Sequence, residues 1–140
     1  MHEAMLHEPC HIPAGVYVGC MYHEYVDLMV GSGATLPPQA FIGNGPPYMV
    51  GRLSYSFGLT GPCVSTDTAC SSSLVAAHLA ARGLIGGEHD AAVAGGINAM
   101  LLGETTAGIS QLQALSAVGR CRWVTFNSFS DVNADLTDKL

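Results

Sequence analysis

The sequence predicts an α/β fold with a mostly parallel central sheet. Three consecutive runs support this prediction: a short β-branched run at residues 63–66, an alanine-rich run with helical spacing from residue 74 onward, and a second apolar run at residues 91–96. A strand, a helix and a strand in this order form a right-handed crossover unit. A strand that is apolar throughout, as 91–96 is, is typical of a parallel sheet that is buried on both faces.

The composition predicts a globular domain whose surface is largely covered. Hydrophobic residues make up 49% of the 140 residues and charged residues 11%, whereas about 25% is usual for charged residues. We expect further protein, from partner subunits or from the remainder of a larger domain, to cover much of this surface. The net charge of −6, with five Lys and Arg residues, leaves no basic face and excludes nucleic-acid binding.

The same features predict a soluble, intracellular protein. The five cysteines are scattered and odd in number, which favours reduced thiols. The longest nearly uncharged apolar segment, residues 91–103, is too short and too glycine-rich to span a bilayer, and the N-terminus has no secretory signal. We expect a cytoplasmic location without a membrane partner, and the sequence does not distinguish the cytoplasm from an organelle.

The elements before the alanine-rich helix follow from their turn residues. We expect a strand at residues 15–20, a short helix at 22–29, and loops at 31–38 and 43–47, where Gly and Pro gather. A helix is predicted at 48–57 because its apolar residues fall on one stripe, with Gly58 as its stop. The helix after residue 71 is expected to pack on most sides, to bury His78 and to end near Gly83 or at residues 86–87.

No metal or dinucleotide site is predicted. The imidazole and thiol side chains near the N-terminus match no zinc-binding spacing; they are His2, His7, Cys10, His11, Cys20 and His23. The glycines at 43 and 45 and at 95 and 96 do not complete a dinucleotide-binding pattern at a strand-to-helix turn. We therefore expect neither a metal ion nor a directly bound cofactor.

Cys70 is the candidate catalytic residue. It lies between the 63–66 strand and the helix whose first turn is expected at residues 71–73, so its thiol faces the free amide hydrogens of a helix start. Such a position stabilises a negative charge by roughly 0.3–1 kcal/mol, which favours the thiolate. The alternative is a small buried core residue, because cysteine is among the most buried residue types.

The sequence around Cys70 resembles a known family. Residues 66–74, Thr-Asp-Thr-Ala-Cys-Ser-Ser-Ser-Leu, are similar to the nucleophile motif of β-ketoacyl synthases, in the form used by type I modular polyketide synthases. The resemblance extends upstream through residues 48–62 and downstream through 92–98 to Gly119-Arg120-Cys121-Arg122. It implies the N-terminal half of a thiolase-like layered fold with a buried nucleophile helix, and Cys70 as the cysteine that accepts an acyl group.

The resemblance also implies the reaction and its partners. The family elongates polyketide or fatty-acid chains by decarboxylative condensation of acyl and malonyl thioesters, which an acyl carrier protein carries on its phosphopantetheine arm, and it works as a homodimer.

Arg52 is expected to be a surface charge, with a buried ion pair or a phosphopantetheine contact as lower-ranked alternatives. The segment 97–115 resembles the part of the family that passes over the acyl pocket, although its apolar residues are also suited to a plain core.

Two alternatives to a complete condensing enzyme stay open. The family also needs two histidines from its C-terminal half, and none of the six histidines here matches them: His2, His7, His11, His23, His78 and His89. The chain could therefore be a catalytically incomplete fragment without activity of its own. The other alternative, a thiol hydrolase, would need a histidine within hydrogen-bond reach of Cys70.

The domain organisation is predicted in three parts. Residues 1–14 form an irregular segment, residues 15–122 a partial ketosynthase domain, and residues 123–140 a tail that does not resemble the family. All 17 glycines lie at or before Gly119, whereas the family continues into a glycine-rich stretch. We expect the tail not to pack as ketosynthase sequence does.

Overall fold

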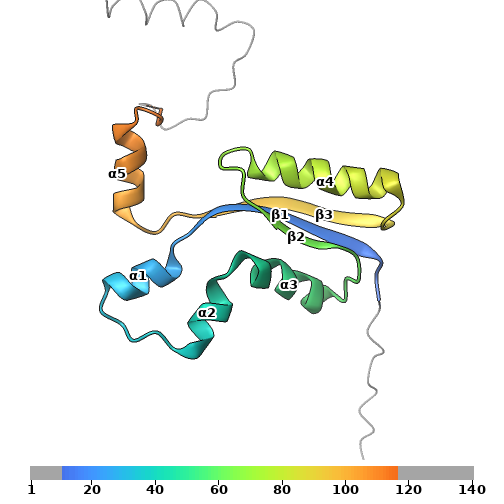
Figure 1. Cartoon of the computed structure of the whole chain (residues 1–140), viewed down its shortest axis with the longest axis horizontal. Coiled ribbons are helices and arrows are strands. Elements are labelled where there is room, and N and C mark those ends of the chain that lie inside the picture. The colour runs from blue at the N-terminus through green and yellow to red at the C-terminus, as the bar shows by residue number, and fades with distance from the viewer. Residues whose placement is uncertain (1–10, 117–140) are drawn as a thin grey trace, which may run out of the picture. The chain divides into compact units, whose positions relative to one another are not determined.

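The structure is a computed structural model that describes residues 11–116. The described chain divides into two compact units, one up to residue 102 and one from residue 103 onward. Figure 1 shows the elements, which follow in the order β1 (Ala14–His23), α1 (Tyr25–Gly31), α2 (Pro38–Asn44), α3 (Pro46–Phe57), β2 (Cys63–Thr66), α4 (Ser72–Gly86), β3 (Ala91–Ala99) and α5 (Gly103–Gln111). The first unit contains the sheet and helices α1–α4, and α5 belongs to the second unit.

The sheet of the first unit has β1 at its centre. Its strand order is β2-β1-β3, and both pairs are parallel. Gly19 of β1 is level with Thr66 of β2 on one side and with Gly96 of β3 on the other. The predicted α/β class and the parallel sheet are confirmed, and the crossover from β2 through α4 to β3 passes over β1.

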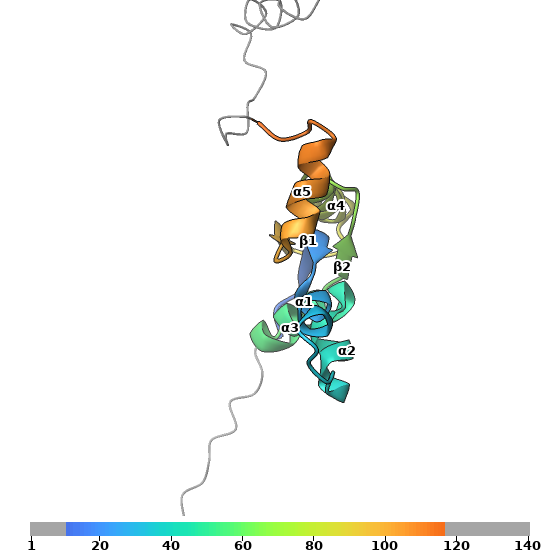
Figure 2. The same ribbon diagram turned by 90° about the vertical axis from the view of Figure 1, so that its left-hand side faces the viewer.

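Helices cover both faces of β1, which is buried from Ala14 to Cys20. Successive strand residues point to opposite faces of a sheet. Val16 and Val18 accordingly pack against Val50 of α3, whereas Tyr17 packs against Ala76 and Ala80 of α4. Figures 1 and 2 show the strands between α3 and α4 in two perpendicular views.

Glycines in the left-handed conformation end the two long helices as predicted. Gly58 has φ 65° and follows α3, and Gly87 has φ 71° and follows α4. In each case an amide beyond the last turn donates to a carbonyl of that turn, which satisfies groups that a helix end leaves open. Prolines 46 and 47 occupy the first turn of α3, where a missing N–H costs nothing.

Two predicted boundaries before α3 are wrong. The helix expected at residues 22–29 is α1 at Tyr25–Gly31, because β1 continues to His23 instead of ending at residue 20. The loop expected at 43–47 is reduced to Gly45, which has extended backbone, since α2 reaches Asn44 and α3 begins at Pro46. The glycine and proline cluster therefore marks a junction between helices.

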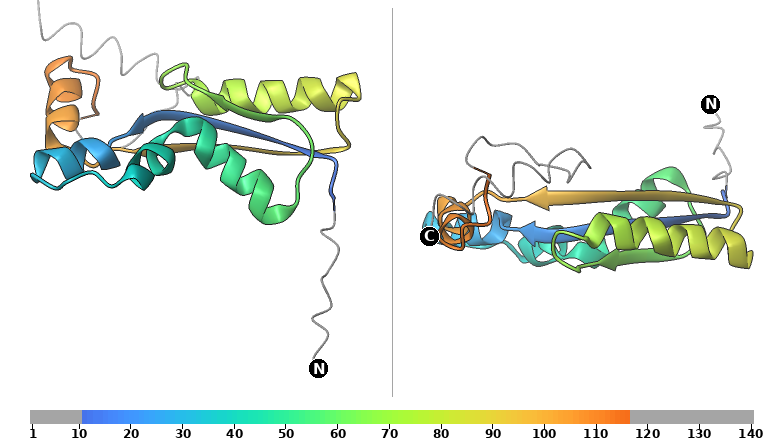
Figure 3. Two further views of the ribbon diagram at one scale, coloured as in Figure 1. Left: turned by 60° about the horizontal axis from the view of Figure 1, so that its bottom comes forward. Right: turned by 90° about the horizontal axis from the view of Figure 1, so that it is seen from above.

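The burial expected for three features is also wrong. Residues 91–96, predicted to be fully buried, are mostly exposed in β3, because β3 is an edge strand of the sheet in the described chain. Helix α4 buries a single stripe of small residues, Ser72, Ala76, Ala80 and Gly83. His78 lies off this stripe and is exposed. Figure 3 shows α4 lying along the strands.

The apolar residues that follow β3 do not form a core within the described chain. Leu101, Leu112 and Leu115 are exposed, and Met100, Leu102 and Ile109 are half-buried. Arg52 is exposed on α3, as expected for a surface charge.

Candidate functional site

Cys70 lies in a tight turn between the end of β2 and the start of α4. Thr66 ends the strand and Ser72 begins the helix. Ala69, directly before Cys70, has φ 57°, a left-handed conformation that residues with a Cβ rarely adopt. The Cys70 side chain is exposed. The predicted strand-to-helix position is therefore confirmed, and the alternative of a buried core cysteine does not describe this chain.

Side-chain hydrogen bonds hold the turn in this conformation. The Asp67 carboxylate accepts from the Ala69 amide at 2.9 Å. The Ser72 hydroxyl accepts from the Thr68 amide at 2.9 Å and donates to the Ala69 carbonyl at 2.6 Å. The Ser71 hydroxyl donates to the Thr68 carbonyl at 2.7 Å. Backbone strain near an active residue persists where surrounding contacts enforce it, and here short polar side chains do so.

Two paired glycines form the base on which the first turn of α4 lies. A Cβ on Gly19 would lie 2.6 Å from the Ser72 carbonyl oxygen and from the Ser73 amide nitrogen. A Cβ on Gly96 would lie 2.6 Å from the Ser73 Cβ. Because Gly19 and Gly96 are register partners in β1 and β3, the helix start approaches the bare backbone of both strands. We call this pair the glycine base.

The other cysteines of the described chain have different surroundings. Cys20 is buried, its thiol lies 3.6 Å from the Tyr22 carbonyl, and burial raises the pKa of this thiol, with a further rise from the negative charge of Asp67. Cys63 is exposed at the start of β2. Cys10 and Cys121 lie outside the described residues. Cys70 is thus the cysteine of residues 11–116 that combines exposure with a strand-to-helix turn.

Within residues 11–116, no hydrogen bond joins a histidine to Cys70. The His89 ring is buried, and its Nε2 lies 2.8 Å from the Tyr17 hydroxyl. His11, His23 and His78 are exposed. A hydrolase with its own Cys–His pair is therefore without support in this part of the chain.

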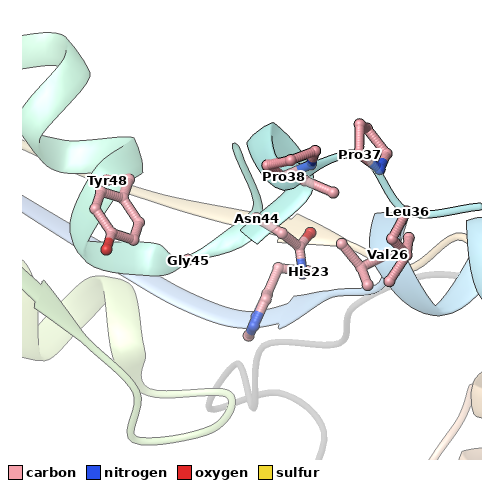
Figure 4. A pocket seen from close by; sticks show the side chains of 9 residues that line it. His23, Val26, Leu36, Pro37, Pro38, Asn44, Gly45 and Tyr48 are labelled. Carbon is pink, nitrogen blue, oxygen red and sulfur yellow. The ribbon is translucent and has the colours of Figure 1, made fainter. Parts of the chain in front are cut away.

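Two pockets that share His23 lie at the carboxyl end of β1, and the smaller one also includes the end of β2 and Asp67 of the turn of Cys70. The smaller has a volume of about 260 Å³ and is lined by Cys20, His23, Pro46, Pro47, Ser65, Thr66 and Asp67. The larger, of about 330 Å³, is mostly apolar and is lined by His23, Val26, Leu36, Pro37, Pro38, Ala40, Asn44, Gly45 and Tyr48. Figure 4 shows Leu36 and the two prolines toward one end of the larger pocket and Tyr48 toward the other.

These pockets were not predicted from the sequence, although one signal for them was present. Ligands of open α/β sheets bind at the carboxyl ends of the strands, and Cys20, His23 and Asp67 stand at or just beyond such ends. Because a loop was predicted at residues 43–47, the packing of α2 against α3, which completes the pocket walls, was not predicted.

Two further features concern metals and membranes. No group of three or more His, Cys, Asp or Glu residues in the described part of the chain is placed to hold a metal ion; of the imidazole and thiol side chains near the N-terminus, His2, His7 and Cys10 lie outside it. None of the described helices has both the length and the apolar character needed to cross a membrane.

Comparison with known proteins decides the family. The model of the "Beta-ketoacyl synthase, N-terminal domain" family matches residues 3–131, which is nearly the whole chain. The chain belongs to the β-ketoacyl synthase family. It is 45% identical over 113 residues to the polyketide synthase GfsA of Streptomyces halstedii, a match that covers 77% of this chain and 2% of that protein. It is 44% identical over 106 residues to a component of the phenolphthiocerol/phthiocerol polyketide synthase of Mycobacterium tuberculosis, covering 76% and 7%.

Solved ketosynthase structures confirm the thiolase-like fold. The ketosynthase from module 6 of the bacillaene synthase of Bacillus subtilis matches with a TM-score of 0.66 and 35% identity, over 79% of this chain and 18% of that one. The oxazolomycin ketosynthase domain OzmH KS7 matches with a TM-score of 0.62 and 35% identity, over 79% and 19%. This ketosynthase chain thus spans less than a fifth of the solved chains and a few per cent of the curated relatives.

The family match and the predicted domain boundaries cover different ranges. The match begins at residue 3 and ends at residue 131, whereas the sequence pattern predicted family sequence over residues 15–122. The predicted tail, 123–140, lies outside the described residues. The division into three parts stays a prediction.

Proposed function

We propose that Cys70 is the nucleophile of a condensing enzyme that elongates polyketide or fatty-acid chains. The observation that carries this proposal is the position of an exposed thiol on a strained, hydrogen-bonded turn at the start of a 15-residue helix. The partial positive charge of a helix N-terminus stabilises an anion near it. A thiolate, unlike a thiol, attacks a thioester carbonyl.

The proposed reaction has two stages. In the first, the Cys70 thiolate attacks the carbonyl carbon of an acyl thioester, the bond from that carbon to the donor sulfur breaks, and the departing thiolate takes up a proton. In the second, a malonyl thioester loses CO₂, its carbanion attacks the acyl carbon, and the bond to Cys70 breaks. The product is a β-ketoacyl thioester on the second donor, and Cys70 returns as a thiolate.

The donor and the other partners belong to the same proposal. Carrier-borne phosphopantetheine would present both thioesters, and the chain itself binds no cofactor in this scheme. The relatives are polyketide synthases by name, which supports a carrier domain as the donor. A homodimer and a cytoplasmic location complete the proposal.

For this chain by itself we propose acyl transfer to Cys70 without efficient condensation. The second stage needs groups that promote decarboxylation and a second oxyanion donor. None of the six histidines matches the family motifs. One oxyanion-hole donor is typically worth about a hundred- to thousand-fold in rate. The first stage also passes through an oxyanion, but it needs no decarboxylation, so we expect it to proceed slowly with Cys70 as the nucleophile.

The test is covalent labelling of the whole 140-residue chain. Incubation with hexanoyl-N-acetylcysteamine, a soluble acyl thioester, should place a hexanoyl group on Cys70, detected by mass spectrometry of the digested protein. Cys70→Ala should abolish this label. Cys63 is the internal control, since it is also exposed but starts a strand instead of following one. Equal acylation of Cys63 and Cys70, or none at Cys70, would contradict the proposal.

A further inference from the structure

The regular ladder between β1 and β3 breaks at its carboxyl end, next to the pockets. The register is irregular between Cys20 and His23. Side chains take over the pairing there: the Tyr22 amide donates to the Asn98 side-chain oxygen at 3.0 Å. Beyond it, the Leu101 and Leu102 amides donate to the Oε2 atom of Glu24 at 2.7 and 2.8 Å. We call Glu24 and Asn98 the polar clasp.

Glu24 is a buried carboxylate, with 6% of its surface exposed. A buried charge is costly unless hydrogen bonds satisfy it, and two backbone amides on one oxygen are charge-assisted bonds of the stronger kind. The Glu24 amide also donates to the Ala99 carbonyl at 3.2 Å. Glu24 thus joins the end of β1 to the segment after β3 through both its backbone and its side chain.

The clasp lies between residues that line the pockets. His23, directly before Glu24, lines both pockets, and Val26, two residues after it, lines the larger one. The smaller pocket also includes Asp67, whose carboxylate holds the turn of Cys70. The irregular part of the β1–β3 pairing ends at His23, and Val26 lies in the first turn of α1, which begins directly after Glu24. The bonds of Glu24 and Asn98 therefore fix the junction between β1 and α1 that carries both wall residues.

We propose that Glu24 and Asn98 are positioning residues for the acyl chain of the thioester. They hold the backbone junction that carries the wall residues His23 and Val26, and the smaller pocket shares Asp67 with the turn of Cys70. Glu24 and Asn98 do not touch the reacting atoms in this scheme. This inference rests on the proposed function of Cys70. The Glu24 carboxylate affects how well the acyl group binds, whereas the turn and the glycine base determine how reactive the Cys70 thiol is.

Two variants of Glu24 distinguish the effect of side-chain length from the effect of charge. Glu24→Gln keeps an oxygen at the same distance from the backbone and can accept both bonds, whereas Glu24→Asp keeps the charge but is one methylene shorter. Asn98→Ala removes the other bond of the clasp at an exposed position and keeps the test available if Glu24→Asp does not fold. Asp27→Asn is the matched control, since Asp27 is an exposed carboxylate in the first turn of α1, the helix that begins directly after Glu24.

The experiment measures two rates at Cys70 in the whole chain. The first is acylation by hexanoyl-N-acetylcysteamine as a function of its concentration. The second is alkylation by iodoacetamide, a small reagent that needs no acyl pocket. Glu24→Asp should raise the half-saturating thioester concentration by about tenfold, because a misplacement of about 1 Å can cost up to about a hundredfold. Asn98→Ala should raise it several-fold, and alkylation should stay within twofold in both variants.

The outcomes distinguish this inference from the proposed function. Near-normal acylation of Glu24→Gln and Asp27→Asn, together with the selective loss in Glu24→Asp and Asn98→Ala, would support the clasp as a positioning device. Unchanged half-saturation in both clasp variants, with normal acylation of the wild type, would overturn this inference and leave the proposed function intact. Equal losses of acylation and alkylation would also overturn it. Absence of acylation in the wild-type chain would overturn both.

Discussion

The left-handed conformation of Ala69 is a local strain that the turn of Cys70 maintains. A residue with a Cβ costs roughly 1–2 kcal/mol more than glycine in this region. The hydrogen bonds from Asp67, Ser71 and Ser72 offset that cost in the folded chain. The conformation of residue 69 should therefore affect stability more than its exposed side chain does.

Substitution of Ala69 tests this strain. Ala69→Val should lower the free energy of unfolding by about 1–2 kcal/mol, because a β-branched residue is a genuine outlier at positive φ. Ala69→Gly should change it by less than about 1 kcal/mol, since relief of strain opposes the larger entropy of the unfolded chain. Urea denaturation measures both. Ala94→Val, at an exposed position of β3, is the control, and equal losses at both positions would contradict this prediction.

The buried Tyr17–His89 pair joins β1 to the segment between α4 and β3. The hydroxyl of Tyr17 lies 2.8 Å from His89 Nε2, and the two rings are tilted at 52°. Gly83 provides the space: a Cβ there would lie 2.9 Å from the Tyr17 hydroxyl. The Nδ1 atom of His89 has no hydrogen-bond partner among the described residues.

Burial raises the pKa of Tyr17, and the negative charge of Glu88 raises it further. A folded-state pKa above the unfolded value of about 10 favours the neutral phenol in the folded chain. This contribution to stability is complete below pH 10 and is lost as the pH rises through the folded pKa. Urea denaturation between pH 8 and pH 11 should show this loss.

Tyr17→Phe should remove that part of the pH dependence and lower the free energy of unfolding at pH 8 by about 1–3 kcal/mol, because His89 loses a buried partner. Tyr55→Phe is the control, since Tyr55 is 88% exposed. A Tyr17→Phe chain with the wild-type slope above pH 10 would contradict the assignment.

At the scale of elements, the glycine base determines how closely α4 approaches the sheet. Ala at position 19 would meet the Ser72 and Ser73 backbone, and Ala at position 96 would meet the Ser73 Cβ. Overpacking of this kind typically costs about 1–3 kcal/mol. Gly19→Ala should be the more harmful, since backbone yields less than a side chain.

Gly95→Ala is the matched control for this prediction, because nothing lies within 4 Å of a Cβ at the neighbouring position. Urea denaturation should give Gly19→Ala the lowest free energy of unfolding, Gly96→Ala a higher value and Gly95→Ala the highest. The iodoacetamide rate of Cys70 should change in the same order. A stability loss in Gly95→Ala equal to that of Gly96→Ala would contradict the role of the base.

The elements that were predicted correctly are those whose signals are local. The helix predicted at 48–57, which begins two residues earlier at Pro46, and the end of α4 before Gly87 depend on prolines and glycines that act within one turn. The position of Cys70 followed from the residues on either side of it. Burial was predicted poorly because the apolar residues of 91–96 do not say whether a neighbouring strand or helix is present to cover them.

The clasp could not be predicted for a related reason. Glu24 and the amides that donate hydrogen bonds to it are more than 70 residues apart in sequence. From the sequence alone, an isolated Glu after a strand is expected to be a surface charge. The glycine base likewise joins residues of two strands and a helix. Such long-range contacts appear only when the strand order β2-β1-β3 is known.

At the scale of the whole molecule, the outer face of α4 and the face of β3 carry exposed apolar side chains. Leu74 is 73% exposed and Ile85 79%, and Val93 and Ile97 of β3 are each 51% exposed. Apolar patches of this kind mark surfaces that further protein covers. The composition of the chain, with 11% charged residues, predicted such surfaces, although it did not predict where they lie.

The isolated chain should therefore bind an apolar dye such as 8-anilinonaphthalene-1-sulfonate without being unfolded. The double substitution Leu74→Lys and Ile85→Lys should reduce the fluorescence gain by at least about half and change the free energy of unfolding by less than about 0.5 kcal/mol, as is usual for surface positions. Ala76→Lys is the contrasting control, since Ala76 is fully buried against β1 and should unfold the chain. Unchanged dye binding in the double variant would place the apolar surface elsewhere.

The glycine base has one consequence for how such a chain can diversify. At Gly19 and Gly96, the first turn of α4 rests on the peptide planes of the two strands and not on their side chains. Residues elsewhere in β1 and β3 can consequently be substituted without changing the distance of the Cys70 sulfur from the sheet. Under the proposed function, such changes would alter which acyl chains fit while Cys70 keeps its position.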